Sequence, residues 1–241
     1  MIAVAHLNET QPALAEQVDQ ITWIKVGELQ KMIDTLRGGN VSEAAMAGGI
    51  SRERLKDSFA PDARALKMLA GIGRFSDDAV LRGVACEIES EGIPMIDPVP
   101  PLVAHWLAGA GSLAGPELQA TQLRDLELAF DVARHVGSFD VGQTVAVKDG
   151  VVAAIEAVEG TNAAMRRGAA LVGKGMVVAK CAKPGQDLRF DRPAIGPDTI
   201  PLLAELGAAA LGIEAGTTLI LECERTLNLA RERGLTVYGR A

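Results

Sequence analysis

The sequence has few of the residues that build disulfide frameworks, zinc sites or catalytic triads. Its three cysteines, Cys86, Cys181 and Cys223, are widely spaced and form no C-x-x-C pair, so neither a disulfide framework nor a zinc site is indicated. The three histidines lie far apart in the sequence without a serine or cysteine elbow motif, which favours structural roles for them. A reducing, cytoplasmic environment is the expectation.

Targeting and membrane-spanning segments are also missing from the sequence. The opening MIAVAHL has no basic region and is too short for the apolar part of a signal peptide. No apolar run reaches the roughly 18 residues that a spanning helix needs. The net charge of −7 and the pI of about 5.1 argue against a general nucleic-acid binder, which would need a basic face. An anionic ligand must therefore be held by local cations.

The order of patterns predicts an α/β protein with two domains, since 241 residues suit two domains of roughly 100–150 residues each. In the first hundred residues, short β-like runs alternate with helical patterns, which is typical of β-α units stacked around a parallel sheet. We expect strands over residues 2–7, 21–26, 43–48 and 92–97, and helices over residues 12–17, 27–36, 61–70 and 76–91.

A stretch rich in proline and glycine interrupts this alternation. We place an N-terminal Rossmann-like domain at 1–101, a linker at 102–120, and a C-terminal α+β domain at 121–241 that carries most of the active site. In the second domain, Asp149-Gly150 predicts a β-hairpin between two alternating runs. Helices over 121–135, from 161 and over 199–206, a strand over 176–180, and a strand, helix and strand up to residue 238 complete it.

Two glycine-rich stretches mimic phosphate-binding motifs. GAALVGKG (168–175) has Gly175 where a P-loop needs serine or threonine, and it follows a helix and precedes a strand, the reverse of that motif. GAGSLA, from residue 109, fits the dinucleotide pattern, but no strand pattern enters it and no clear helix leaves it. Neither stretch is expected to bind phosphate, and the second is interpreted as part of the linker.

Three polar clusters remain: FDVGQT (139–144), IEAVEGTN (155–162) and KPGQDLRFDRPAIGPDT (183–199). Taken singly, their residues have ordinary explanations, because Gln143 begins a strand, Thr161 and Thr199 could cap helices, and surface acids pair with surface bases. Together they supply carboxylates, glycines, cations and a helix N-terminus at strand ends. Phosphoryl-transfer chemistry uses these parts to hold Mg²⁺ and to neutralise phosphate oxygens.

The same three clusters, with AAALGIEAGTTLILE (208–222), resemble the hallmark segments of the UDP-2,3-diacylglucosamine pyrophosphatase family of lipid A biosynthesis, in the branch unrelated to calcineurin-like phosphoesterases. RFSDDAVLRGVACEIESEGI (74–93) and AAMAGGISR (44–52) are similar to the N-terminal signatures of that family. The resemblance runs from about Gly27 to the C-terminus.

The resemblance implies a metal-dependent hydrolase that splits UDP-2,3-diacylglucosamine into UMP and 2,3-diacylglucosamine 1-phosphate (lipid X), with Mg²⁺ or another divalent metal as cofactor. It implies a glycolipid nucleotide as the partner, no nucleic acid, and a cytoplasmic protein in peripheral contact with the inner membrane face of a Gram-negative bacterium. The oligomeric state is left open, with a homodimer as one option.

With the resemblance as a guide, site residues can be assigned. Glu156, Glu159, Asn162 and Asp187 are the expected catalytic residues, Glu159 and Asp187 being the expected metal ligands. The expected substrate-binding residues are Asp77, Asp78, Gln143, Gly160, Thr161, Arg166, Lys183, Gln186, Arg189, Asp191 and Thr199. Among these, Arg166, Lys183 and Arg189 are expected on phosphate oxygens.

The chain departs from the family pattern at two places. The family usually opens with a strand and a glycine-rich turn before the segment that MIAVAHL resembles, so the first sheet is expected to be incomplete here. Asn162 stands where the family segment reads Glu-Gly-Thr-Asp. The asparagine either caps a helix as well as aspartate does or removes a catalytic carboxylate. The alternative functions are a non-catalytic sugar-nucleotide or lipid-binding module with the same pocket, and a soluble nucleotide-sugar hydrolase without a lipid substrate.

Overall fold

The computed structural model describes residues 1–50, 59–73, 76–99 and 104–241. The chain forms two compact units: unit 1 is Met1–Pro100 with Asp187–Asp191, and unit 2 is Pro101–Gln186 with Arg192–Ala241. The expected boundary between residues 101 and 102 lies outside the described residues. The order of elements does not predict that a short segment from the second half of the chain belongs to unit 1.

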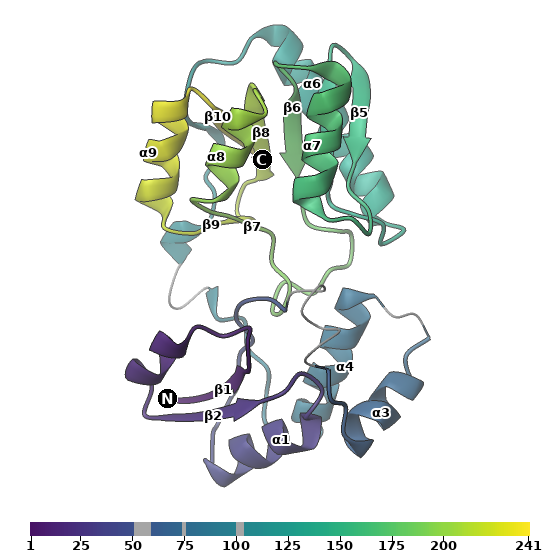
Figure 1. The fold of residues 1–241 in the computed structure, drawn as a ribbon, viewed down its shortest axis with the longest axis vertical. Helices are drawn as coiled ribbons and strands as arrows, with labels where there is room; N and C mark the ends of the chain where they lie inside the picture. Colours follow the sequence, from purple (N-terminus) through teal and green to yellow (C-terminus); the bar gives the residue numbers. More distant parts are fainter. Residues whose placement is uncertain (51–58, 74–75, 100–103) are drawn as a thin grey trace. The chain divides into compact units, whose positions relative to one another are not determined.

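Unit 1 contains a parallel pair of strands with helices beside it (Figure 1). Its elements are β1 (Ile2–His6), η1 (Pro12–Glu16), β2 (Gln20–Ile24), α1 (Leu29–Gly38), α3 (Ala63–Ala70) and α4 (Asp77–Glu89). β1 and β2 pair in parallel, as the β-α pattern predicts. Asp62 caps α3 by accepting the N–H of Ala65 at 2.8 Å, and it also accepts the N–H of Gln30 on α1 at 2.6 Å. One carboxylate therefore ties the two helices together.

The strands expected over residues 43–48 and 92–97 are wrong as full strands. The two segments meet in one parallel bridge, Ala44 with Met95, held by the N–H groups of Ala44 and Ile96. Pro94 has no N–H to donate to a ladder, and Gly48 and Gly49 offer no side chains to pack. The pairing therefore does not extend along either segment.

Unit 2 is built around a six-stranded sheet in the order β3-β10-β8-β6-β4-β5. Its strands are β3 (Gly111–Ala114), β4 (Thr144–Lys148), β5 (Val151–Ile155), β6 (Val177–Lys180), β8 (Ala210–Glu214) and β10 (Thr236–Arg240), with the small pair β7 (Ala194–Ile195) and β9 (Leu219–Ile220) beside them. Its helices are η2 (Ala104–Trp106), α6 (Ala120–Gly137), α7 (Thr161–Val172), α8 (Thr199–Glu205) and α9 (Cys223–Arg233). β6, β8 and β10 run parallel, whereas β3, β4 and β5 pair with their neighbours antiparallel.

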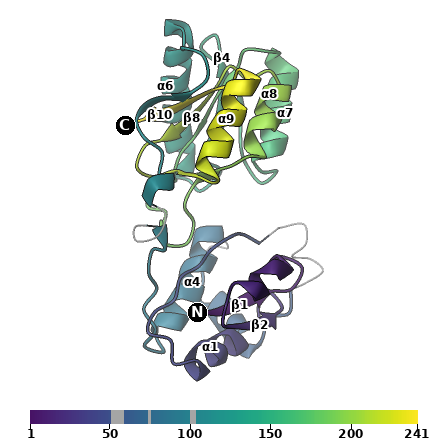
Figure 2. The ribbon, with the colours of Figure 1, turned by 90° about the vertical axis from the view of Figure 1, so that its left-hand side faces the viewer.

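Helices cover both faces of this sheet. Figure 2 shows α6 on one side and α7, α8 and α9 on the other. On the α6 side, Leu126 and Phe130 are buried against Val145 and Ala179 of the sheet. On the opposite side, a separate hydrophobic core contains buried side chains of α7, α8 and α9. Since both faces are buried, the central parallel strands are almost entirely apolar. In the described part of the chain, no helix is long and apolar enough to cross a membrane.

Part of the expected linker belongs to the sheet. Residues 111–114 form β3, which pairs antiparallel with β10 at the edge of the sheet. A Cβ on Gly239 of β10 would collide with the carbonyl oxygen of Gly109, so glycine permits the two backbones to approach here. Gly115, one of the glycines read as linker signals, likewise allows close approach, because a Cβ there would collide with the carbonyl oxygen of Leu235.

The predicted hairpin is confirmed, and a buried carboxylate supports its turn. Asp149 and Gly150 join β4 to β5 with φ angles of +52° and +76°, the sign pattern of a type I′ turn. Asp125 of α6, only 7% exposed, accepts the N–H groups of Asp149 and Gly150, both at 2.8 Å. The turn residues thus have their backbone donors satisfied by a helix on the neighbouring face.

Replacing Asp125 with alanine is expected to lower the free energy of unfolding of unit 2 by about 2–3 kcal/mol, because it leaves two turn N–H groups without their acceptor. Urea denaturation would measure the loss, and the amides of Asp149 and Gly150 should exchange hydrogen faster. Glu127→Ala on the same helix, which removes an exposed ion pair to Arg240, is the control and should cost less than about 0.5 kcal/mol. A loss equal to that of the control would contradict this role for Asp125.

Candidate active site

A cavity of about 170 Å³ lies in unit 2 between the sheet and the helices α7 and α8, and it reaches the carboxyl end of β6 at Lys180. Its lining combines polar and apolar side chains: Thr144, Thr161, Asn162, Met165, Val178, Lys180, Thr199, Leu202, Leu203 and Leu211. Thr144 begins β4 directly opposite Lys180, the last residue of β6, and α7 and α8 also begin at this end. Ligands of open α/β sheets bind at this end of the strands.

The start of α7 differs from the expected cap. Gly160, with φ of +82°, is the N-cap, and no side chain caps the first turn, whereas Thr161 or Asn162 was expected at that position. The helix therefore begins at Thr161, and Asn162 is its second residue. A glycine permits the positive φ with which the chain enters α7. First-turn N–H groups at a helix N-terminus carry partial positive charge and attract anions.

Glu156 organises this end of the sheet. Its Oε1 accepts the Thr161 hydroxyl at 2.7 Å, and its Oε2 accepts the backbone N–H of Gln143 at 3.4 Å. The Thr161 hydroxyl also lies 3.5 Å from that of Thr144. A Cβ on Gly142 would collide with the carbonyl oxygen of Glu156, so the glycine of FDVGQT allows the two loops to touch. The structure thus brings together three expected site residues from two of the polar clusters.

The cations of α7 lie at the exposed rim of this end. Arg167 Nη2 contacts Glu159 Oε1 at 2.7 Å, and the N–H of Ala157 donates to Glu159 Oε2 at 3.2 Å. The hydrogen bond from Arg167 holds the pKa of the Glu159 carboxyl below its usual value. Arg166, the preceding residue, is exposed. Glu159 is therefore ionised and exposed, and it is paired with a cation within its own unit.

The loop after β6 carries the next expected residues of unit 2. Lys183 Nζ contacts Asp140 Oδ1 at 2.6 Å, and the backbone N–H of Lys183 donates to Gln186 Oε1 at 2.8 Å. Thr199, the first residue of α8, accepts the N–H of Gly196 through its hydroxyl at 3.3 Å and lines the cavity. Lys183 is thus paired with an acid from FDVGQT, so these two polar clusters meet as well.

The remaining expected residues lie in unit 1. Ser76 caps α4 by accepting the N–H of Ala79 at 3.3 Å, which places Asp77 and Asp78 in the first turn. Asp78 Oδ1 accepts the backbone N–H of Asp187 at 3.1 Å. The expected residues of this unit are Asp77, Asp78, Asp187, Arg189 and Asp191, and those of unit 2 are Gln143, Glu156, Glu159, Gly160, Thr161, Asn162, Arg166, Lys183, Gln186 and Thr199.

Asp187 is held by arginines. Arg189 contacts both carboxylate oxygens of Asp187, through Nε at 3.0 Å and Nη2 at 2.9 Å, and Arg82 Nη1 lies 3.9 Å from Oδ2. The hydrogen bonds from Arg189, assisted by the charge of Arg82, hold the pKa of Asp187 below its usual value. The N–H of Asp191 donates to the backbone oxygen of Asp187 at 3.2 Å, which closes the turn.

Carboxylates are suitable ligands for Mg²⁺, but those of the described residues do not cluster around one point. Among the described residues, no group of three or more His, Cys, Asp or Glu side chains is placed to hold a metal. The two expected ligands, Glu159 and Asp187, belong to different units. Mg²⁺ is commonly held by only one or two carboxylates together with substrate phosphates. Each carboxylate could by itself serve as one such ligand.

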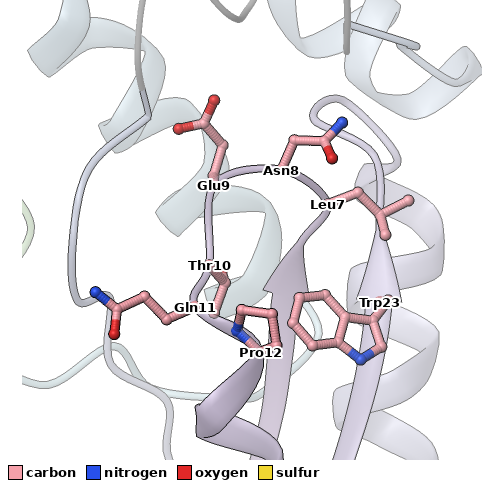
Figure 3. Close-up of a pocket in the computed structure, with 7 residues that line it drawn as sticks. All are labelled: Leu7, Asn8, Glu9, Thr10, Gln11, Pro12 and Trp23. Atoms are coloured by element: carbon pink, nitrogen blue, oxygen red, sulfur yellow. The ribbon is translucent and has the colours of Figure 1, made fainter.

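A second hollow, of about 580 Å³, lies in unit 1 beside the loop that follows β1 (Figure 3). It is lined by residues 7–12 and by Trp23 of β2. In Figure 3 the indole of Trp23 lies beside Pro12 and Leu7, and Asn8 and Glu9 occupy the far end of the loop. Sequence reasoning placed no site residue here.

Sequence reasoning also missed two residues of the cavity in unit 2. Lys180 Nζ donates to the backbone oxygen of Ala194 at 2.8 Å and lines the cavity, and Thr144 is 1% exposed. Thr144 is the first residue of β4 and Lys180 is the last residue of β6, so each is a polar residue beside an apolar strand segment. Ligand sites of parallel sheets lie at the carboxyl ends of their strands. That position was the available signal.

The comparisons with known proteins agree with this arrangement of motifs. A family model described as the LpxI N-terminal domain matches residues 1–102, and one described as the LpxI C-terminal domain matches residues 109–238. The chain belongs to the LpxI family. It is 36% identical over 227 residues to the UDP-2,3-diacylglucosamine pyrophosphatase LpxI of Caulobacter vibrioides, an alignment that covers 90% of this chain and 80% of that protein. The family resemblance seen in the sequence motifs is therefore confirmed.

The role of residue 162 in catalysis by this LpxI family member can be tested by a single substitution. An aspartate there would add a full negative charge and a proton acceptor at the start of α7, beside the cavity. We expect Asn162→Asp to raise metal-dependent turnover by at least about 10²-fold, equivalent to roughly 3 kcal/mol. Thermal stability should change little, because both residues are tolerated at a helix start.

Steady-state kinetics with and without Mg²⁺ would measure this effect. Asn228→Asp, at an exposed position of α9 in the same unit, is the matched control for added charge. Equal turnover of the wild-type protein and the Asn162→Asp variant would show that residue 162 only supports the helix.

Proposed function

We propose that this chain hydrolyses the pyrophosphate bond of UDP-2,3-diacylglucosamine, releasing UMP and 2,3-diacylglucosamine 1-phosphate, in lipid A biosynthesis. The observation that carries the proposal is the match of both LpxI family models, together with 36% identity across 90% of the chain to a pyrophosphatase with that substrate. Nothing in these comparisons favours the non-catalytic binding module or a hydrolase without a lipid substrate.

The reaction adds water across a P–O–P linkage, so one P–O bond forms and another breaks. The obstacle is the negative charge of the phosphate oxygens, which repel the nucleophile. In this proposal the uncapped start of α7, with Thr161 and Asn162, and the cations Lys180, Lys183 and Arg166 bind these oxygens. Glu156 fixes the Thr161 hydroxyl by the 2.7 Å hydrogen bond described above. An oriented donor needs no reorganisation during the reaction.

A divalent metal is part of the proposal. When bound, Mg²⁺ would neutralise phosphate oxygens and lower the pKa of a water molecule. Glu159 of unit 2 and Asp187 of unit 1 are each proposed as a metal ligand, and both side chains are partly exposed, at 31% and 15%, so an ion could bind either carboxylate beside its arginine contact. Their lowered pKa values keep both carboxylates ionised at neutral pH.

The setting follows from the proposed substrate. A lipid with two acyl chains is delivered from a bilayer, so we propose a cytoplasmic protein that contacts the inner membrane of a Gram-negative bacterium peripherally.

The decisive assay is UMP release from UDP-2,3-diacylglucosamine with and without Mg²⁺. Turnover should require the metal and the acyl chains, because binding energy from the remote chains can position the reacting pyrophosphate. UDP-N-acetylglucosamine is the control substrate and should react at least about 10²-fold more slowly in kcat/KM. If it reacts as well as the diacyl compound, the lipid substrate is wrong.

Asp187→Ala is expected to lower kcat by about 10²-fold or more, since one transition-state contact is commonly worth about 3 kcal/mol. Circular dichroism should show an intact fold. Asp34→Ala, an exposed aspartate on α1 that accepts only a local hydrogen bond from Gln30, is the matched control and should leave kcat unchanged. Unchanged turnover in folded Asp187→Ala protein would remove this residue from the mechanism.

A further inference from the structure

The segment Asp187–Asp191 is anchored in unit 1 by one buried aromatic side chain. Phe190 is 9% exposed and belongs to the core of this unit, with Leu29, Ile33 and Ile88. The neighbouring Arg189 lies with its guanidinium carbon 4.6 Å from the centre of the Phe190 ring. A buried phenylalanine fixes the backbone on either side of it, so Asp187 and Arg189 have a defined position relative to α4.

Most N–H donors of the Arg189 guanidinium have acceptors within unit 1. Nε and Nη2 form a fork on the two oxygens of Asp187, at 3.0 and 2.9 Å. Nη1 contacts Glu89 Oε1 at 3.0 Å and the backbone oxygen of Met95 at 3.2 Å. A phosphate oxygen could bind Nε or Nη1 only by displacing a carboxylate or a carbonyl. The expected role of Arg189 as a phosphate ligand therefore competes with its contacts in unit 1.

Asp187 is fixed from a second direction by α4. Its backbone N–H donates to Asp78 Oδ1 at 3.1 Å, and the other oxygen of Asp78 accepts Arg82 Nε at 2.7 Å. Arg82 reaches on towards Asp187 Oδ2, at 3.9 Å. The backbone and the side chain of Asp187 are thus held by different residues, which leaves its carboxylate little freedom to turn.

We propose that Arg189 is a positioning residue that fixes the carboxylate of Asp187, with Glu89 holding Arg189 in turn, and that it does not bind the substrate. The inference rests on the proposed function, in which Asp187 acts at the reacting phosphate. Catalytic groups must be held within a fraction of an ångström, because a displacement of about 1 Å can cost about 10²-fold in rate. Arg189 supplies that rigidity through a planar fork, which the single ammonium group of lysine cannot reproduce.

The kinetic test compares Arg189→Lys and Glu89→Gln with Glu87→Gln as the matched control. Glu87 lies on the same helix and pairs with Arg64 at 2.6 Å, so its substitution breaks a comparable ion pair away from Asp187. Arg189→Lys should lower kcat by at least about tenfold with KM changed by less than about threefold, the pattern of a contribution made only in the transition state. Glu89→Gln should lower kcat by about threefold or more, and Glu87→Gln should not.

A direct phosphate contact predicts the opposite pattern. Loss of a ground-state contact in Arg189→Lys would raise KM and leave kcat unchanged. Glu89→Gln would then leave kcat unchanged or improve binding, because it frees the guanidinium from a competing carboxylate. Either result in folded protein, or a kcat of Arg189→Lys equal to that of the wild type, overturns the positioning role.

A second measurement does not depend on turnover. In ¹H–¹⁵N spectra of the full chain, the Nε–H of Arg189 should exchange slowly with water, and both Asp187→Asn and Glu89→Gln should speed its exchange by about tenfold or more. Addition of UMP should leave the signal in place. Fast exchange in the wild type, or displacement of the signal by UMP, would overturn the inference. If the Nε–H of Arg189 exchanges slowly as expected but the wild type releases no UMP, the contact between Arg189 and Asp187 is supported and the proposed function is wrong.

Discussion

The burial of three parallel strands on both faces is the constraint on which the candidate site in unit 2 depends. β6, β8 and β10 are covered by α6 on one face and by α7, α8 and α9 on the other, and the side chains of β6 and β8 are apolar up to the last residue of each strand. In these two strands the charged residues stand at that end. Lys180 and Glu214 stand there, and the first turns of α7 and α8 reach the same edge. The fold itself therefore collects charge and helix N-termini in one place.

Much of this arrangement could be predicted from the sequence because local chemistry determines it. Asp149-Gly150 fixes the hairpin through two positive φ angles, and Ser76 determines the start of α4. The helices and most strands followed from periodicity and caps. The strands expected near Ala44 and Met95 failed because proline and glycine stop their ladder. β3 was missed because Gly115, which follows it, was read as a linker signal although it serves close backbone approach. Glycine has several uses, and its neighbours in space decide which one applies.

The sequence motifs predicted which residues belong to the candidate site, but they did not predict which of these residues contact one another. The pairing of Glu156 with Thr161 within IEAVEGTN is local, whereas the contact of Asp140 with Lys183 joins residues from separate clusters. The cluster that begins at Lys183 is divided: Lys183 and Gln186 belong to unit 2, and the segment around Phe190 belongs to unit 1. No periodic pattern in the sequence indicates that the chain returns to unit 1 at this segment. The signal that existed was a lone phenylalanine in a charged loop, since an aromatic side chain there needs an apolar partner.

The charges of the site explain how an acidic protein could accept a pyrophosphate. Lys183, Arg167 and Arg189 each contact a carboxylate within their own unit, at 2.6, 2.7 and 2.9 Å. Such pairs keep long cationic side chains oriented, but each pair carries no net charge, so it attracts an anion less than a lone cation would. Binding a pyrophosphate then requires that the acids exchange their partners or that a divalent cation joins them. The second course leaves every arginine and lysine contact in place, and it favours the proposed dependence on magnesium over binding by side-chain cations alone.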